Sequence, residues 1–219
     1  MTSLLDLSAD FADVADAVEA VTLRARGSSP ESPGTPIAHA LRRAVTTREA
    51  AVSSGRYTAS DVTWHLPVAE VPVAPRLGDV LCDAGGCAWT VLEVAQTTLA
   101  SRWRVTSRSL AVIYALDDVI SILQATFAKG DGGAAEPTWT PWMSDLRARI
   151  QPLALEIDDE YEARVATTRV RIFLAESLVL NETHRVRGSD GTIYKVLGMT
   201  AAERIDELSC IDAEVTPWP

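Results

Sequence analysis

The chain has 219 residues, 47% of them hydrophobic, and its formal net charge is −10 at pH 7. This composition supports a packed core and argues against a disordered chain, and the length suits two domains of about 100 residues each. The acidic balance argues against a protein that grips nucleic acid by its phosphates, because that binding depends on Lys and Arg.

Membrane, secreted and metal-binding classes are also disfavoured. No apolar run approaches the ~20 residues of a membrane-spanning helix, so no membrane contact is expected. The first residues carry acids where a signal peptide carries Lys or Arg. Cys82, Cys87 and Cys210 do not form a disulfide framework or a Cys-x-x-Cys site. No metal or other cofactor is expected.

The N-terminal segment, residues 1–15, is predicted to form a short helix or a docking arm. Leu4, Leu5 and Phe11 stand at roughly helical spacing in an otherwise acidic stretch. We take these three side chains as candidate interface residues.

An internal repeat follows, at an offset of about 105 residues. Five segments of the first half match segments of the second half in the same order: 16–25 with 117–126, 38–49 with 145–156, 63–70 with 169–176, 76–94 with 182–199, and 101–112 with 204–215. In the fourth match, Trp89 takes the place of Tyr194. This order favours an ancient duplication over two unrelated β domains.

Each repeat is predicted to be a small antiparallel β-barrel or sandwich, the first over residues 16–116 and the second over 117–219, so the fold class is mainly β. Short β-branched segments alternate with turn signals, and Gly85-Gly86 and Asp190-Gly191 suit hairpin turns. The predicted core residues are Leu66, Trp89, Val91, Ile172, Tyr194 and Val196.

Long loops are predicted between the first two strands of each repeat, at residues 27–36 and 129–144. The second loop contains Trp139, Trp142 and Met143, which we take as candidate interface residues; the alternative is burial against the barrel of their own repeat. The acidic run within 153–166 is interpreted as a solvated face.

No catalytic pattern is present. His39, His65 and His184 belong to no known catalytic motif, and the chain has no phosphate-binding glycine loop. Adjacent carboxylates such as Asp158-Asp159 point to opposite faces of a strand. We expect no enzymatic activity. Tryptophans such as Trp64 could serve as stacking platforms for a ligand.

Three strand-like motifs carry a family resemblance. They are Arg147, Arg149, Ile150 and Gln151; then Arg169, Val170, Arg171 and Ile172; then Asp190, Gly191, Tyr194 and Val196. With this order the second repeat resembles the head-closure, or head–tail joining, proteins of tailed bacteriophages. The resemblance covers residues 145–216, and the first repeat matches only through the duplication. Family members are usually single units, whereas this chain has two.

The resemblance implies a non-enzymatic virion protein at the neck, made in the host cytoplasm. Its implied partners are further copies of itself in a ring of twelve or six, portal or adaptor proteins above, and tail or tail-terminator proteins below. Packaged DNA would pass without tight binding, as the acidic charge favours. The alternatives are another phage structural barrel, such as a tail-attachment, tail-terminator or capsid-decorating protein, or a ligand-binding β module.

Overall fold

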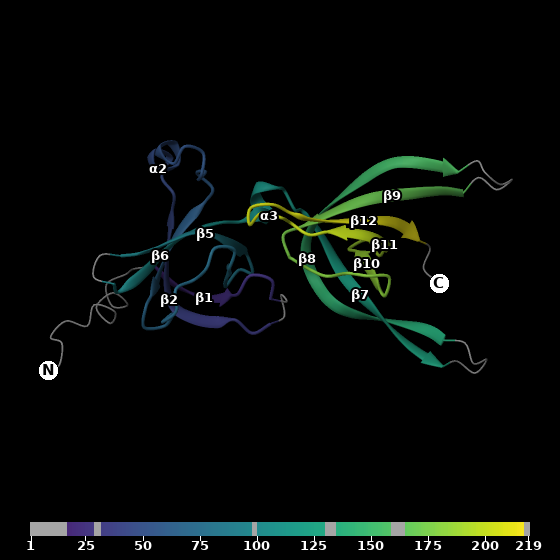
Figure 1. The fold of residues 1–219 in the computed structure, drawn as a ribbon, viewed down its shortest axis with the longest axis horizontal. Helices are drawn as coiled ribbons and strands as arrows, with labels where there is room; N and C mark the ends of the chain where they lie inside the picture. The colour runs from purple at the N-terminus through teal and green to yellow at the C-terminus, as the bar shows by residue number, and fades with distance from the viewer. Residues whose placement is uncertain (1–16, 29–31, 98–99, 130–134, 159–164, 217–219) are drawn as a thin grey trace. The chain divides into compact units, whose positions relative to one another are not determined.

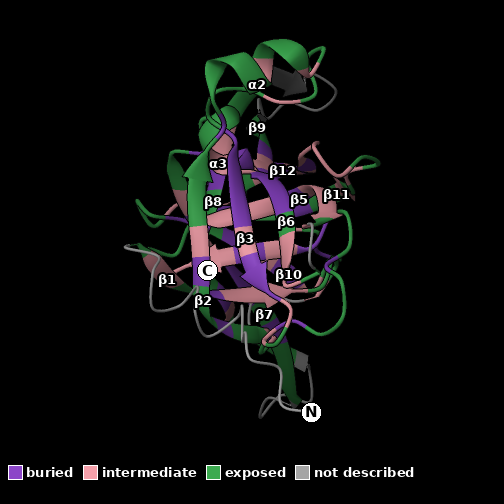
Figure 2. Ribbon diagram, turned by 90° about the vertical axis from the view of Figure 1, so that its left-hand side faces the viewer, coloured by how far each residue is buried: buried purple, intermediate pink, exposed green. Residues whose placement is uncertain are grey.

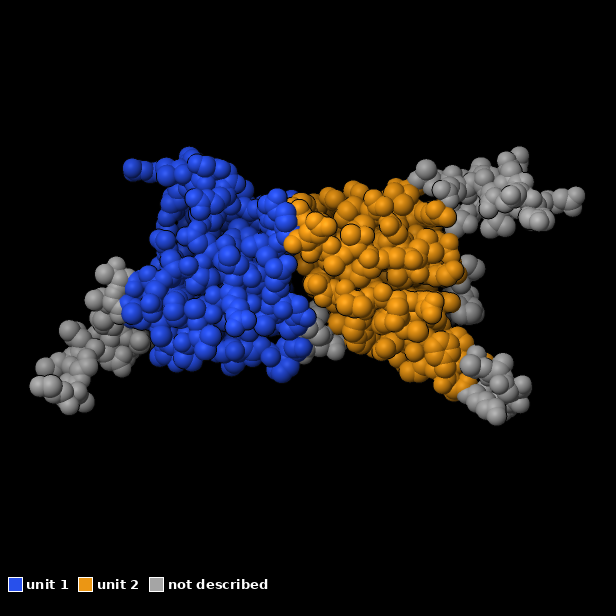
Figure 3. Space-filling view, in the orientation of Figure 1, with its two compact units in different colours: residues 1–28, 32–113, 204–206 blue, residues 29–31, 114–203, 207–219 orange. Residues whose placement is uncertain are grey.

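The computed structural model describes residues 17–28, 32–97, 100–129, 135–158 and 165–216, and it contains two closed antiparallel β-barrels in tandem (Figure 1). The chain divides into two compact units with the break between Ile113 and Tyr114 (Figure 3). This confirms the mainly β, two-barrel prediction. The N-terminal helix or arm, with Leu4, Leu5 and Phe11, lies outside the described residues.

The first barrel is formed by β1 (Val18–Arg24), β2 (Thr35–Ala44), β3 (Val62–Pro67), β4 (Val80–Asp83), β5 (Ala88–Gln96) and β6 (Arg102–Arg108). It also carries α2 (Thr47–Val52), and α3 (Leu110–Ile113) follows β6. The second barrel is formed by β7 (Asp118–Lys129), β8 (Ala135–Asp158), β9 (Val165–Leu174), β10 (His184–Gly188), β11 (Ile193–Thr200) and β12 (Ser209–Thr216).

Both barrels have the same connectivity. The strand order is β1-β2-β3-β6-β5-β4 in the first and β7-β8-β9-β12-β11-β10 in the second, so each strand has a counterpart six strands later. Trp89 in β5 pairs with Leu81, and Tyr194 in β11 pairs with Val186. In both strands a register irregularity begins two residues further on. Trp89 and Tyr194 therefore occupy equivalent positions, as the duplication predicts.

One stretch of the sequence matching was out of register. In the first barrel Val91 pairs with Ser107 of β6, which pairs with Val62 of β3. In the second barrel Val196 pairs with Ala213 of β12, which pairs with Val170 of β9. Val62 is thus the counterpart of Val170, and Trp64, two residues on, is the counterpart of Ile172. The sequence matching had instead aligned Leu66 with Ile172. A shift of two residues leaves every side chain on the same face of a strand, so an alternating pattern alone does not reveal it.

Five of the six predicted core residues are buried: Leu66, Val91, Ile172, Tyr194 and Val196. Trp89 is only half-buried, so that prediction was wrong. Its indole Nε1 donates to Asp83 Oδ2 at 3.0 Å, and the Arg42 guanidinium lies 5.9 Å from its ring. These polar contacts place Trp89 at the margin of the core.

Trp64 fills the centre of the first barrel. It is 0% exposed, and its Nε1 donates a hydrogen bond of 2.9 Å to the hydroxyl of Ser107. Its ring meets that of Trp89 edge to face, with 6.3 Å between centroids. Trp64 is thus a core residue and cannot serve as a stacking platform for a ligand.

The predicted hairpin turns are present. Gly86 and Gly191 have φ values of +79° and +86°, a region that glycine adopts without strain. Asp83 Oδ1 accepts hydrogen bonds from the backbone N–H groups of residues 85 and 87, and Asp190 Oδ1 accepts one from residue 192. Both turns are therefore held by the carboxylate of a nearby Asp.

Helix α2 was not predicted. Thr46 and Glu49 form a capping box, in which the Thr46 side chain accepts from Glu49 N and the Glu49 carboxylate accepts from Thr46 N. These bonds and the ion pair with Arg43, at 2.6 Å, lower the pKa of Glu49 to about 2. The helix has no buried residue, in contrast to β3, which is buried almost throughout (Figure 2). Among the described residues, no helix has the length and apolar character needed to cross a membrane.

The first predicted loop lies between β1 and β2, but the second prediction was wrong. Residues 135–144 belong to β8, which pairs with β7 as far as Ala135. Pro137 and Pro141 had suggested a loop because proline cannot donate to a ladder. In this part of β8 the only pairing partner in the described chain is β7, so the prolines occupy an edge, where they are tolerated.

Candidate interaction surface

Two hairpins of the second barrel extend as ribbons beyond its wall (Figure 1). We define the first arm as residues 125–129 of β7 paired with residues 135–139 of β8, and the second arm as residues 155–158 of β8 paired with residues 165–168 of β9. The pairing of β10 with β7 ends at Gln124, before the first arm, and the pairing of β12 with β9 ends at Arg169, before the second arm. Each arm is therefore two strands wide.

Such ribbons have free edges. Apart from one hydrogen bond of 2.9 Å from Ala125 N to Thr183 O, no backbone contact of the first arm to strands other than its own is found in the described chain. A two-stranded hairpin is marginally stable in water, and unpaired strand edges offer N–H and C=O groups to a partner. The free edges of the two arms are therefore the candidate sites for strand pairing with a partner.

The two faces of the first arm differ in character. Ile122 is fully buried in the barrel core, so the side chains that alternate with it along β7, and their partners in β8, face outward. Within the arm this face comprises Ala125, Phe127, Pro137 and Trp139, of which Phe127 and Pro137 are exposed, Trp139 is half-buried and Ala125 is buried. The opposite face is polar, with Gln124, Thr126, Thr138 and Thr140. We call the apolar side the outer face of the first arm.

The aromatic residues of the outer face differ in exposure. Phe127 is 61% exposed, whereas Trp139 is half-buried. The guanidinium carbon of Arg185, in β10, lies 4.2 Å from the Trp139 ring centroid, which is a close cation–π contact. Trp139 Nε1 and Arg185 Nη1 are both buried and have no hydrogen-bond acceptor among the described residues. Neither donor is therefore satisfied within the described chain.

The outer face is bordered by positive charge. Arg185 and Arg187 alternate with the buried Val186, so both point outward, and neither forms an ion pair with a described residue. Two other cations of this barrel are paired, Arg171 with Asp212 at 2.8 Å and Lys195 with Glu214 at 3.1 Å. Arg185 and Arg187, on the strand next to β7, therefore offer positive charge near the root of the first arm.

The root of the first arm is packed into the barrel. Met143 is 2% exposed and belongs to the core cluster, and Trp142 packs against that cluster. The ring of Trp142 also lies 5.0 Å from the ring of His184, whose Nδ1 is 2.8 Å from Asn181 Oδ1. Burial lowers the pKa of His184.

The predicted interface residues of the second repeat therefore separate. The expectation is wrong for Met143, because a core methionine offers no surface to a partner. Trp142 packs against the core cluster at the root of the arm. Of the three predicted residues, Trp139 is the one that lies on the outer face of the arm. Phe127 was missed, since a single exposed aromatic residue in a predicted strand gives no local signal.

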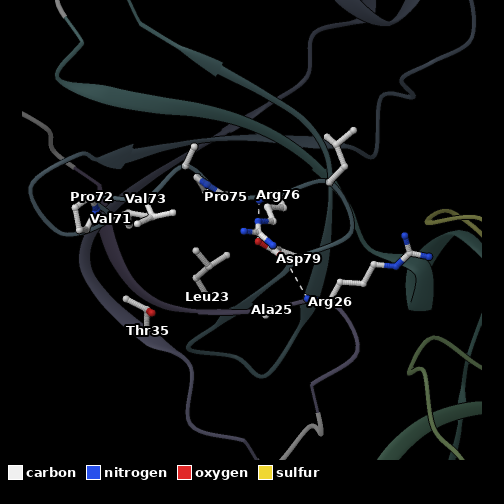
Figure 4. A pocket seen from close by; sticks show the side chains of 12 residues that line it. Leu23, Ala25, Arg26, Thr35, Val71, Pro72, Val73, Pro75, Arg76 and Asp79 are labelled. Atoms are coloured by element: carbon white, nitrogen blue, oxygen red, sulfur yellow. Dashed lines mark hydrogen bonds between the residues drawn. The ribbon is translucent and has the colours of Figure 1, made fainter.

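A second candidate lies in the first barrel. A cavity of about 620 Å³ opens between the end of β1 and the segment 71–79 (Figure 4). Its wall includes Leu23 and Val73, and Val73 is 72% exposed. Asp79 shapes the segment by accepting hydrogen bonds from the backbone N–H groups of Arg26, at 3.0 Å, and Arg76, at 2.8 Å. The cavity is apolar with two cationic side chains at its margin, which suits an apolar or anionic group of modest size.

Within the described ranges, no three His, Cys, Asp or Glu side chains gather closely enough to hold a metal ion. The three histidines lie in different places: His39 pairs with Glu70 at 2.6 Å, His65 lies in β3, and His184 lies at the root of the first arm.

Comparison with models of known protein families finds no match, and comparison with curated protein sequences also finds none.

Proposed function

We propose that this chain is a non-enzymatic assembly protein whose second barrel binds neighbouring subunits through its two arms. The observation that carries the proposal is the pair of two-stranded ribbons with free edges on an otherwise closed barrel. A closed barrel has no edge to offer, so arms of this kind concentrate strand-pairing capacity at two places.

The assembly we propose is the neck of a tailed bacteriophage, with the chain as a head-closure or head–tail connector component. This rests on the resemblance of residues 145–216 to that family, whose motifs lie in β8, in β9, and in β11 with the turn before it. A ring requires heterologous contacts, in which one patch meets a different patch on the next subunit. Arms that project from a rigid barrel are suited to such contacts, and portal, adaptor and tail proteins would be the partners above and below.

The tandem arrangement bears on stoichiometry. Six chains with two barrels of equal connectivity would present twelve similar barrels, whereas twelve full chains would present two sets of twelve. Among the described residues, long paired arms are found in the second barrel, whereas β1 and β2 of the first barrel are 7 and 10 residues long. The barrels are therefore not interchangeable at the interface, and this difference favours twelve chains.

A ligand-binding β module is the second candidate function, and the cavity beside Leu23 favours it. A module of this kind would bind a small apolar or anionic ligand without any assembly. Other stations in a phage particle, such as tail attachment, tail termination or capsid decoration, would use the same arms with other partners.

The test of the proposed function is the position of the chain in a particle. An antibody against the second barrel, applied to tailed particles that contain the chain, should place gold label at the head–tail junction. Label on the capsid shell or on fibres would contradict the neck function, and absence from all particles, together with ligand binding by the purified chain, would support the module.

A further inference from the structure

We propose that the outer face of the first arm binds the N-terminal segment, residues 1–16, of a second copy of this chain. The inference rests on the proposed function in that it assumes contact between copies, and it names the two surfaces that meet. It concerns the chemistry of the segment, whose sequence is MTSLLDLSADFADVAD.

The segment and the arm are complementary in charge. The segment has Asp6, Asp10, Asp13 and Asp16 and no Lys or Arg. The outer face is bordered by Arg185 and Arg187, neither with an ion-pair partner in the described chain. Opposite charges steer association and fix register, so the segment is drawn to this arm.

The two surfaces are also complementary in apolar character. The segment offers Leu4, Leu5 and Phe11, and the arm offers the exposed ring of Phe127 beside Trp139. A carboxylate arriving with the segment would find the exposed guanidinium of Arg187, which has no ion-pair partner in the described chain. Apolar anchors flanked by charge-assisted hydrogen bonds are the usual composition of a specific peptide site.

The length of the segment matches that of the arm. Sixteen residues reach about 24 Å as a helix and about 50 Å when extended. The outer edge of β8 from Ala135 to Met143 measures about 30 Å at ~3.3 Å per residue. An extended segment can therefore cover the whole of this edge, whereas a helical one falls short of it.

The second arm is a poor alternative for the same segment. Its sequence around the hairpin, EIDDEYE at residues 156–162, is strongly acidic. Like charges would repel the N-terminal aspartates. Of the two arms, only the first has the charge to attract this segment.

Binding is tested with a fluorescent peptide of residues 1–16 and a full-length chain in which Leu4, Leu5 and Phe11 are changed to Ser, so that its own segment cannot compete. Fluorescence anisotropy at low salt should give saturable binding. The additional changes Phe127→Ser and Arg187→Glu, both at exposed positions, should weaken it by about tenfold or more. The matched control is Val52→Ser with Arg56→Glu, which removes an exposed apolar residue and an exposed cation from the first barrel and should change nothing.

Two peptides control for specificity. The 1–16 peptide with Leu4, Leu5 and Phe11 replaced by Ser should not bind, and a peptide of residues 155–166 should bind at least tenfold more weakly than the natural segment. Equal binding of the 155–166 peptide would show a surface that accepts any acidic chain, and it would overturn the proposal. No binding of the 1–16 peptide would overturn it as well.

Contact between copies is tested by mixing two full-length variants. One carries Leu4→Ser, Leu5→Ser and Phe11→Ser; the other carries Phe127→Ser and Arg187→Glu. Each alone lacks one half of the contact, but the mixture retains one complete contact, so chemical cross-linking should give heterodimers and few homodimers. If the peptide binds but the mixture gives no heterodimers, the segment folds back on its own chain and the proposal is wrong. None of these outcomes depends on where the chain lies in a particle, so failure here is distinct from failure of the neck function.

Discussion

Truncation of Trp64 should strongly destabilise the first barrel. The side chain is 0% exposed and donates a 2.9 Å hydrogen bond to Ser107 Oγ. Core Trp→Ala changes cost about 3–5 kcal/mol, and loss of the donor also leaves the buried Ser107 hydroxyl with one partner fewer. With a urea m value of about 1.5 kcal/mol/M for a barrel of this size, a loss of about 4 kcal/mol lowers the midpoint by roughly 2.7 M.

The assay is urea unfolding followed by hydrogen exchange and mass spectrometry, which reports each barrel through its own peptides. Trp64→Ala should lower the midpoint for β1–β6 and leave that for β7–β12 unchanged. Trp64→Phe should cost less, because most of the ring volume remains. Trp89→Ala should also cost less, since Trp89 is only half-buried. If Trp89→Ala destabilises the barrel as much as Trp64→Ala, the assignment of Trp64 as the central core residue is refuted.

Three further predictions concern charge. Asp61 is 0% exposed and accepts hydrogen bonds from Arg108 at 2.8 and 2.9 Å. The change Asp61→Ala leaves the largely buried Arg108 cation without this partner. It should lower the free energy of unfolding of the first barrel by about 3–5 kcal/mol in the same urea assay. Burial lowers the pKa of His184 from its ordinary 6.5, so the neutral ring contributes stability that is fully present above pH 6.5 and declines as the pH falls below it. The melting temperature of the second barrel should therefore fall as the pH is lowered below 6.5, and His184→Gln should reduce this pH dependence. The chain should not shift duplex DNA in a gel at micromolar concentration and physiological salt, because its net charge is −10; a tight shift with steep salt dependence would contradict this.

The tandem barrels could be predicted because their signals are local. Alternation of apolar residues, glycine-containing turns and the repeat itself are all visible within short windows of sequence. The buried Val91 and Val196 and the positive φ of Gly86 and Gly191 follow from these patterns. The sequence also contains a signal for α2, the Thr46–Glu49 capping box.

The arms could not be predicted in the same way. Pro137 and Pro141 indicate a loop in any local interpretation, and only the absence of a second neighbour strand makes them compatible with β8. The contact of Trp139 with Arg185 joins residues from different hairpins. The candidate surface depends on contacts between residues that are distant in the sequence. The sequence therefore predicted Trp139 as an interface residue, but it did not predict Phe127, Arg185 or Arg187.

The central claim, that the arms of the second barrel are subunit contacts in a neck ring, is tested most directly by a cryo-EM reconstruction of intact tailed particles without imposed symmetry. The account predicts the chain on the particle axis at the head–tail junction, in a closed ring, with the outer face of the first arm covered by a neighbouring copy. A chain located off the axis, or a ring in which Phe127 and Trp139 face solvent, would contradict it.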